Sequence, residues 1–160
     1  MTILDNYITK MNEKRHYQNA FRKALLTRIK QLEDTVFSRQ DLLSDKSNQA
    51  QLRLNRALNA LVDEGHVIKI SHGLYARAIK LSFPNGEIQI VLEESFEKVA
   101  IAALNKLGVK WEFSGAIQAY NSGETTQVPA VFSIKLKSRF RGTIEAEGRK
   151  LIFEGKKYAR

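Results

Sequence analysis

The chain has 160 residues, 43% of them hydrophobic, which suffices for one ordinary domain or two small ones with a packed core. It contains no cysteine, and this excludes disulfides, thiolate zinc sites and cysteine nucleophiles. The net charge of +9 favours a polyanionic partner such as DNA, RNA or an acidic protein.

The charge is unevenly distributed along the chain. Residues 1–80 carry 14 basic and 8 acidic side chains, residues 81–134 carry 3 and 6, and residues 135–160 carry 9 and 3. No apolar run approaches the roughly 18 residues of a membrane-spanning helix. The N-terminus also lacks the basic, apolar and small-residue order of a signal peptide. We therefore expect a cytoplasmic protein without a membrane partner.

The first half of the chain predicts helices followed by a hairpin. Apolar residues recur at helical spacing from about residue 17 to residue 32, behind an N-terminal extension of residues 1–16. A short extended link and a brief helix capped by Ser38 come next. The clearest element is an amphipathic helix over residues 49–64, which Gly65 ends.

Two short β-branched runs follow that helix. Residues 67–70 and 74–76 flank Ser71-His72-Gly73, where glycine suits a tight hairpin turn. The order helix, short strand, helix, helix, hairpin is that of a winged helix-turn-helix. We therefore expect an N-terminal winged helix-turn-helix domain over residues 1–80.

The second half predicts a smaller domain over residues 81–160. A loop at 82–86 is followed by an extended run, a helical stripe that ends at Gly108, and residues with period-two alternation between 131 and 153. Gly148 lies where a hairpin would turn. The expected fold class is thus α+β, with the winged helix followed by a small α/β C-terminal region of antiparallel strands.

Duplex DNA is bound through its phosphates and read through base edges, to which arginine and amide side chains pair well. The polar side of helix 49–64 carries such residues, and polar side chains of the hairpin could contact phosphate oxygens. The candidate DNA-binding residues in this half are Arg39, Ser47, Gln49, Gln51, Arg53, Asn55, Arg56, Asn59, Lys69, Ser71, His72 and Arg77. The alternative is that these side chains only solvate a helix and a turn.

A second candidate phosphate-contacting surface lies near the C-terminus. Lys135, Lys137, Arg139 and Arg141 stand at alternate positions, so that a strand would point all four to one face. A plain solvated strand edge is the competing interpretation.

Catalytic and cofactor motifs are missing from the sequence. It has no glycine-rich phosphate loop, no GxSxG elbow and no HxxxH pair among its three histidines. The glutamates at 93, 94 and 97 suit the start of a helix better than an active site. We expect no enzyme, no cofactor and no metal site.

Three stretches, VFSRQDLL, ALNALVDEGHVIKISHGLYAR and SGAIQAYNSGETTQVPAVFSIKLKSR, resemble the small winged-helix proteins related to AbiEi-type antitoxins of abortive-infection toxin–antitoxin systems. The resemblance covers residues 17–160, and its most specific pieces are Gly73-Leu74-Tyr75 and the block from Gly115 to Ala130. The threonines of that block could instead only turn the chain into the next strand.

The resemblance implies a regulator that represses its own operon by binding inverted repeats in double-stranded DNA. It also implies an antitoxin that counters a nucleotidyltransferase-like toxin without a stable complex. In this chain the recognition helix would hold Gln49, Arg53 and Arg56, and the wing would hold Lys69, Ser71 and His72. Inverted repeats are compatible with a homodimer, which no residue of the sequence demonstrates.

Two rival functions remain open at the level of sequence. The basic face could bind an acidic partner protein. RNA could be bound through Tyr75, Trp111 and Phe113, although their pattern is that of buried side chains.

Overall fold

The computed structural model describes residues 2–155 and has a mixed α+β fold with a helical N-terminal region and antiparallel sheets. The basic residues Lys156, Lys157 and Arg160 lie outside the described residues. Within the described part of the chain, no helix combines the length and the apolarity needed to cross a bilayer.

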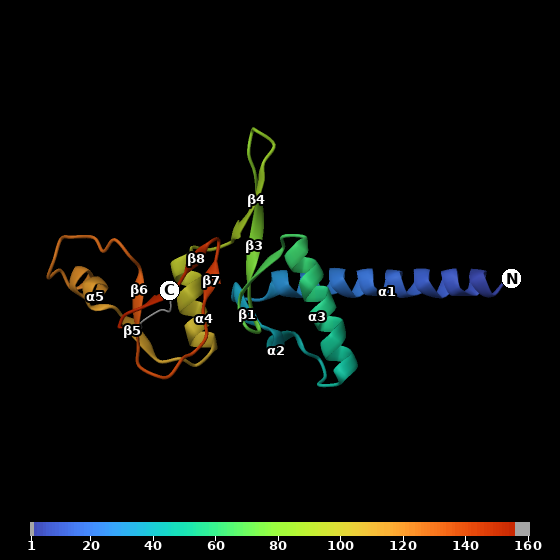
Figure 1. Ribbon diagram of the computed structural model, residues 1–160, viewed down its shortest axis with the longest axis horizontal. Helices are drawn as coiled ribbons and strands as arrows, with labels where there is room; N and C mark the ends of the chain where they lie inside the picture. Colours follow the sequence, from blue (N-terminus) through green and yellow to red (C-terminus); the bar gives the residue numbers. More distant parts are fainter. Residues whose placement is uncertain (1, 156–160) are drawn as a thin grey trace.

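Three helices and a short strand precede the first hairpin. They are α1 (Ile3–Gln31), β1 (Val36–Ser38), α2 (Arg39–Leu42) and α3 (Asn48–Asp63). The predicted helix at 49–64 and the Ser38 cap are confirmed. The segment 1–16 is not a separate extension, because α1 begins at Ile3 with a capping box between Thr2 and Asp5. In Figure 1 this helix runs from the body to the N-terminus as one straight rod.

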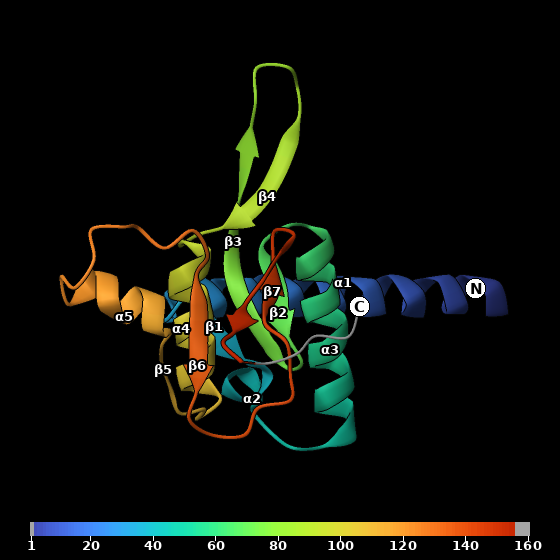
Figure 2. The same ribbon diagram turned by 60° about the vertical axis from the view of Figure 1, so that its left-hand side comes forward.

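Strand β3 (Leu74–Ser82) organises the first sheet. Its first part pairs antiparallel with β1 on one side and with β2 (Val67–Ser71) on the other, giving the order β1-β3-β2. Its second part pairs with β4 (Ile88–Leu92) in a hairpin that projects from the body in Figures 1 and 2. The expected boundary at residue 80 therefore falls inside β3.

The two faces of this sheet contact different halves of the chain, as side-chain alternation along a strand allows. Phe37, Val67 and Tyr75 pack against the core of α1 and α3, and the Phe37 and Tyr75 rings stack 5.9 Å apart. Neighbouring residues such as Val36 and Ala76 face the second core instead. The sheet is therefore buried from both sides.

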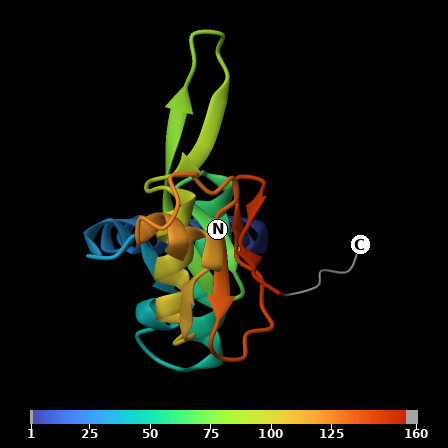
Figure 3. The same cartoon turned by 90° about the vertical axis from the view of Figure 1, so that its left-hand side faces the viewer.

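The second core is built from α4 (Phe96–Lys106) and the C-terminal strands. Val99, Ala100, Ala103 and Leu104 recur at helical spacing on α4 and are all buried there. The remaining elements are β5 (Trp111–Phe113), α5 (Gly115–Asn121), β6 (Ser133–Leu136), β7 (Glu145–Ala146), β8 (Arg149–Lys150) and β9 (Ile152–Phe153). Figure 3 shows this part of the chain end-on, with the β3–β4 hairpin projecting beyond it.

The C-terminal strands are only partly as expected. Strands β5 and β6 are antiparallel, and β7 and β8 form the predicted hairpin with Glu147 and Gly148 at positive φ. Strands β6 and β9, however, pair in parallel. Strand β9 reaches β6 after the intervening β7–β8 hairpin and not through a tight turn, so this pair is parallel beside the antiparallel pairs that were expected.

Candidate nucleic-acid interface

Helix α3 begins where the sequence placed it. The Ser47 hydroxyl accepts a hydrogen bond from the Ala50 N–H, and the Ser47 N–H donates to Asp45 Oδ1 at 2.6 Å. One side of the helix, including Leu54, Leu58 and Leu61, is buried against α1 and the sheet. The helix is thereby fixed with its opposite side toward solvent.

The solvent side of α3 carries several of the predicted residues. Gln49, Arg56 and Asn59 are exposed, and Asn55 is half-buried at the margin. Sequence reasoning did not single out Asn48 and Leu52 as contact residues, although both are exposed on the same side. Leu52 is 55% exposed. A helical wheel drawn from the N-cap at Ser47 would have found both.

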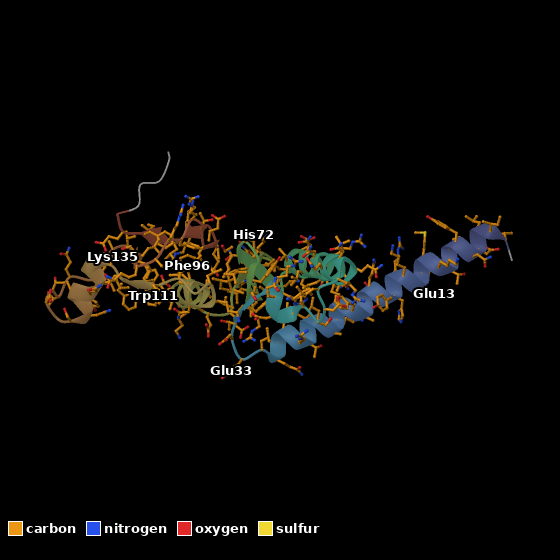
Figure 4. The ribbon with its side chains drawn as sticks, turned by 90° about the horizontal axis from the view of Figure 1, so that it is seen from below. Glu13, Glu33, His72, Phe96, Trp111 and Lys135 are labelled. Carbon is orange, nitrogen blue, oxygen red and sulfur yellow. The ribbon has the colours of Figure 1, made fainter. Side chains whose placement is uncertain are left out.

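Arg39 connects the β2–β3 turn to the first turn of α3. The Arg39 N–H donates to the carbonyl of Gly73 at 2.9 Å, and its Nη2 donates to Gln51 Oε1 at 3.0 Å. Lys69 and His72 are exposed beside this contact, while Ser71 is half-buried. In Figure 4, His72 and α3 lie toward one long side of the molecule. The turn and the start of α3 are therefore linked through Arg39, and the exposed residues of α3 and of the β2–β3 hairpin are together called the α3–turn surface here.

Arg39 and Gln51 use their polar groups for hydrogen bonds within the protein. Gln51 Nε2 also donates to the Lys46 carbonyl, and Arg39 Nε is buried without a hydrogen-bond partner among the described residues. Both side chains are half-buried. Their geometry positions the turn and does not present them to a ligand.

Arg53 is turned away from the open side of α3. Its guanidinium lies 4.8 Å from the Phe21 ring centroid and 5.9 Å from that of Tyr17, and it donates to the Tyr17 hydroxyl. Arg53 is half-buried, and its Nε is also buried without a partner in the described chain. The structure therefore distinguishes Arg53 from Arg56, which the sequence treated alike, since α1 covers Arg53 and leaves Arg56 exposed.

Arg77 does not lie at the hairpin tip. It donates to the carbonyls of Leu32 and Ile29 at 2.7 and 3.2 Å and pairs with Glu93 at 3.0 Å, leaving its side chain 13% exposed. These carbonyls belong to the C-terminal end of α1, where helical partners run out. Arg77 therefore binds the last carbonyls of α1 and holds that helix end in place. In this position its guanidinium is not available for the predicted phosphate contact.

The C-terminal cations do not form one strand face. Strand β6 ends at Leu136, so Lys137, Arg139 and Arg141 lie beyond it. Lys135 and Lys137 approach Glu112 at 3.7 and 3.4 Å, as cross-strand neighbours of β5. Arg139 and Arg141 are exposed in the following loop. The prediction that one strand face carries all four cations was wrong. The alternation of basic residues continues in the sequence after the pairing of β6 with β5 has ended at Leu136.

A carboxylate also lies next to the α3–turn surface. Hydrogen bonds from the side chain and the backbone of Ser47 lower the pKa of Asp45, so it is ionised at neutral pH. Lys46 next to it is exposed and was likewise not singled out from the sequence. The start of α3 thus mixes one anion with nearby cations.

The aromatic residues considered for RNA are engaged in packing. Tyr75 is buried, while Trp111 and Phe113 meet edge-to-face at 5.2 Å and the Trp111 indole donates to Asn105.

Comparison of the chain with known protein families, with curated proteins and with solved structures gave no match.

Proposed function

We propose that residues 1–82 form a winged helix-turn-helix that binds double-stranded DNA in a sequence-specific way. The order α1, β1, α2, α3, β2, β3 and the sheet order β1-β3-β2 support this assignment. In such an arrangement α3 would be the helix that enters the major groove, and the β2–β3 turn would be the wing.

The observation that carries the proposal is the α3–turn surface. It comprises Gln49, Arg56 and Asn59 from the helix, Lys69 from β2 and His72 from the turn, all of which are exposed. Arginine can bind guanine and the amides can bind adenine, while lysine neutralises phosphate. The exposed Leu52 would contact a thymine methyl group in the same groove.

The resemblance to AbiEi-type antitoxins gives this DNA binding a biological setting. The protein would act in the cytoplasm as a repressor of its own toxin–antitoxin operon, with an operator made of inverted repeats. It would counter a nucleotidyltransferase-like toxin functionally, without a stable complex. Neither a catalytic role nor a cofactor is needed for this activity.

A second candidate is a protein-interaction module that binds an acidic partner. The exposed Leu52 favours it, because an apolar side chain ringed by polar ones is typical of the centre of a protein interface. Binding to the upstream region of the protein's own reading frame separates the two functions. A sequence-specific DNA-binding protein should stay bound to the upstream region when random duplex DNA is added in excess. A module that binds acidic proteins should not.

The decisive variant is Arg56→Ala, with Arg139→Ala as a control that removes the same charge from an exposed loop. Loss of a base contact should weaken binding to the upstream region by about 1–3 kcal/mol, and binding to random DNA by much less. The control should leave the preference for the upstream region unchanged. An Arg56→Ala protein with wild-type affinity and preference would overturn the assignment of α3 as the reading helix.

A further inference from the structure

The N-terminal part of α1 extends beyond the body of the protein. Every residue from Thr2 to Ala20 is exposed, and this segment is here called the arm. The arm runs past α3 in Figure 1, and in Figure 4 its N-terminal end lies toward the same long side of the molecule as α3 and His72. A ligand that covers α3 on this side can therefore also reach the arm.

A groove lies between the arm and α3. It has a volume of about 600 Å³, and its lining includes Lys14 from the arm together with Gln49 and Arg56 from α3. Neither Lys14 nor Arg56 forms an ion pair within residues 2–155. DNA that rests on Gln49 and Arg56 would thus lie at the mouth of a groove that Lys14 lines from the side of α1.

The other charged side chains of the groove are engaged within the protein. Arg22 pairs with Glu64 at 3.1 Å, and two aromatic rings of α1 cover Arg53. Asp45 is the one carboxylate of the lining, and it accepts a hydrogen bond from the Ser47 N–H. The lysine of the arm is therefore the cation with which α1 can add to the charge of α3.

The side of the arm that meets the groove continues outward with polar side chains. An α-helix turns about 100° per residue. Between residues 7 and 18, the side chains within about 60° of Lys14 are Tyr7, Lys10, Met11, Tyr17 and Gln18. All but Met11 bear an amine, a hydroxyl or an amide, the groups with which proteins contact phosphate oxygens. The two carboxylates of the arm lie farther round the helix, Glu13 at about 100° from Lys14 and Asp5 at about 180°.

We propose that Lys10 and Lys14 bind phosphates of the same DNA duplex that α3 reads. This inference rests on the proposed function and adds a second helix to its interface. Lys10 lies four residues, about 6 Å, farther along the helix, and each DNA strand carries one phosphate per about 3.4 Å of duplex axis. The two lysines can therefore reach different phosphates of one strand. Because every base pair has the same phosphates, the arm adds affinity without sequence preference.

Replacement of both lysines tests the proposal. Lys10→Gln/Lys14→Gln removes two charges from the groove side of α1. Lys23→Gln/Lys30→Gln removes two exposed charges from the other side of the same helix, at about 180° and 160° from Lys14. Each phosphate contact contributes about 0.9 to the slope of log affinity against log salt, so the arm variant should lose about 1.8 of this slope and bind about 60-fold more weakly at 0.1 M salt. The control variant should keep the wild-type slope.

Fluorescence anisotropy on the upstream region and on random duplex measures these changes. The arm variant should weaken on both DNAs alike and keep its preference, whereas Arg56→Ala should lose preference. Wild-type affinity in the arm variant, or equal losses in the arm and control variants, would overturn the inference and leave DNA binding by α3 intact. A loss confined to the upstream region would overturn the assignment to phosphates. A wild-type chain that binds no duplex would refute the proposed function and this inference together.

The absence of cysteine allows a direct test of position. A thiol-reactive iron chelate attached to Lys14→Cys should cut the DNA backbone beside the bases protected by the protein. The same chelate on Lys23→Cys, on the other side of the helix, should cut much less. Equal cutting from both positions would refute the placement of the arm on DNA.

Discussion

Arg77 offers the sharpest test of how this fold uses its cations. The sequence marks it as a DNA contact next to the hairpin, whereas the structure places its guanidinium on two carbonyls at the end of α1. Replacement by methionine keeps most of the side-chain stem and removes only the charged donors. The variant therefore separates a role in folding from a role in binding.

The expected cost follows from the contacts. Each hydrogen bond from a charged donor contributes about 1.5 kcal/mol, so the two carbonyl contacts give about 3 kcal/mol. The ion pair with Glu93, whose side chain is 41% exposed, adds little because solvent screens it. With a urea dependence of about 2 kcal/mol per molar, the midpoint of unfolding should fall by about 1.5 M.

Urea titration followed by circular dichroism measures this change, with Arg139→Met as the control. That exposed loop residue should alter the free energy of unfolding by no more than about 0.5 kcal/mol. Affinity of the folded Arg77→Met protein for DNA should stay close to wild type. Unchanged stability together with weakened DNA binding would refute the reasoning and restore the original interpretation of Arg77.

Three further outcomes follow from single contacts. Asp45→Asn removes an anion beside the start of α3 and should tighten DNA binding by about twofold at low salt, with the gain lost as salt rises, in a fluorescence-anisotropy titration. Burial raises the pKa of Asp41, but hydrogen bonds from Lys106 and Ser38 outweigh it and hold that pKa below 3.8. Because the lowered pKa stabilises the fold above about pH 4, Lys106→Met should cost up to about 1 kcal/mol at neutral pH. The difference from wild type should vanish as the pH falls through the lowered pKa, and a cost that persists in acid would exclude the ion pair as its source. Gly65→Ala should cost about 1–2 kcal/mol by thermal unfolding, because Gly65 has φ +80° and an added Cβ would meet an Ile90 methyl at 2.6 Å; a neutral result would show that the hairpin base yields.

The local elements were largely predictable because their signals are local. Helix α3 has an N-cap at Ser47, apolar residues at helical spacing and a glycine at positive φ after its last turn, and all three can be read without knowing the partner. The same holds for the hairpin at Gly148 and for the stripe on α4. The start of α1 was missed, because the polar residues 13–16 separate Met11 from Tyr17, where the predicted helix began.

Which cations are free could be decided only by the tertiary structure. Arg53 and Arg56 are the same residue type and lie one turn apart on α3. Because α1 crosses α3, two of its aromatic rings cover Arg53 and leave Arg56 exposed. The alternation of Lys135 with Lys137 persists in the sequence past the point where β6 loses its partner. A periodic pattern records which side a residue would take within an element, and it contains no information about where the pairing ends or what packs on that side. Charge and periodicity thus determined the helices, the turn and the supply of polar side chains, while contacts between distant segments selected those that solvent, or a ligand, can reach.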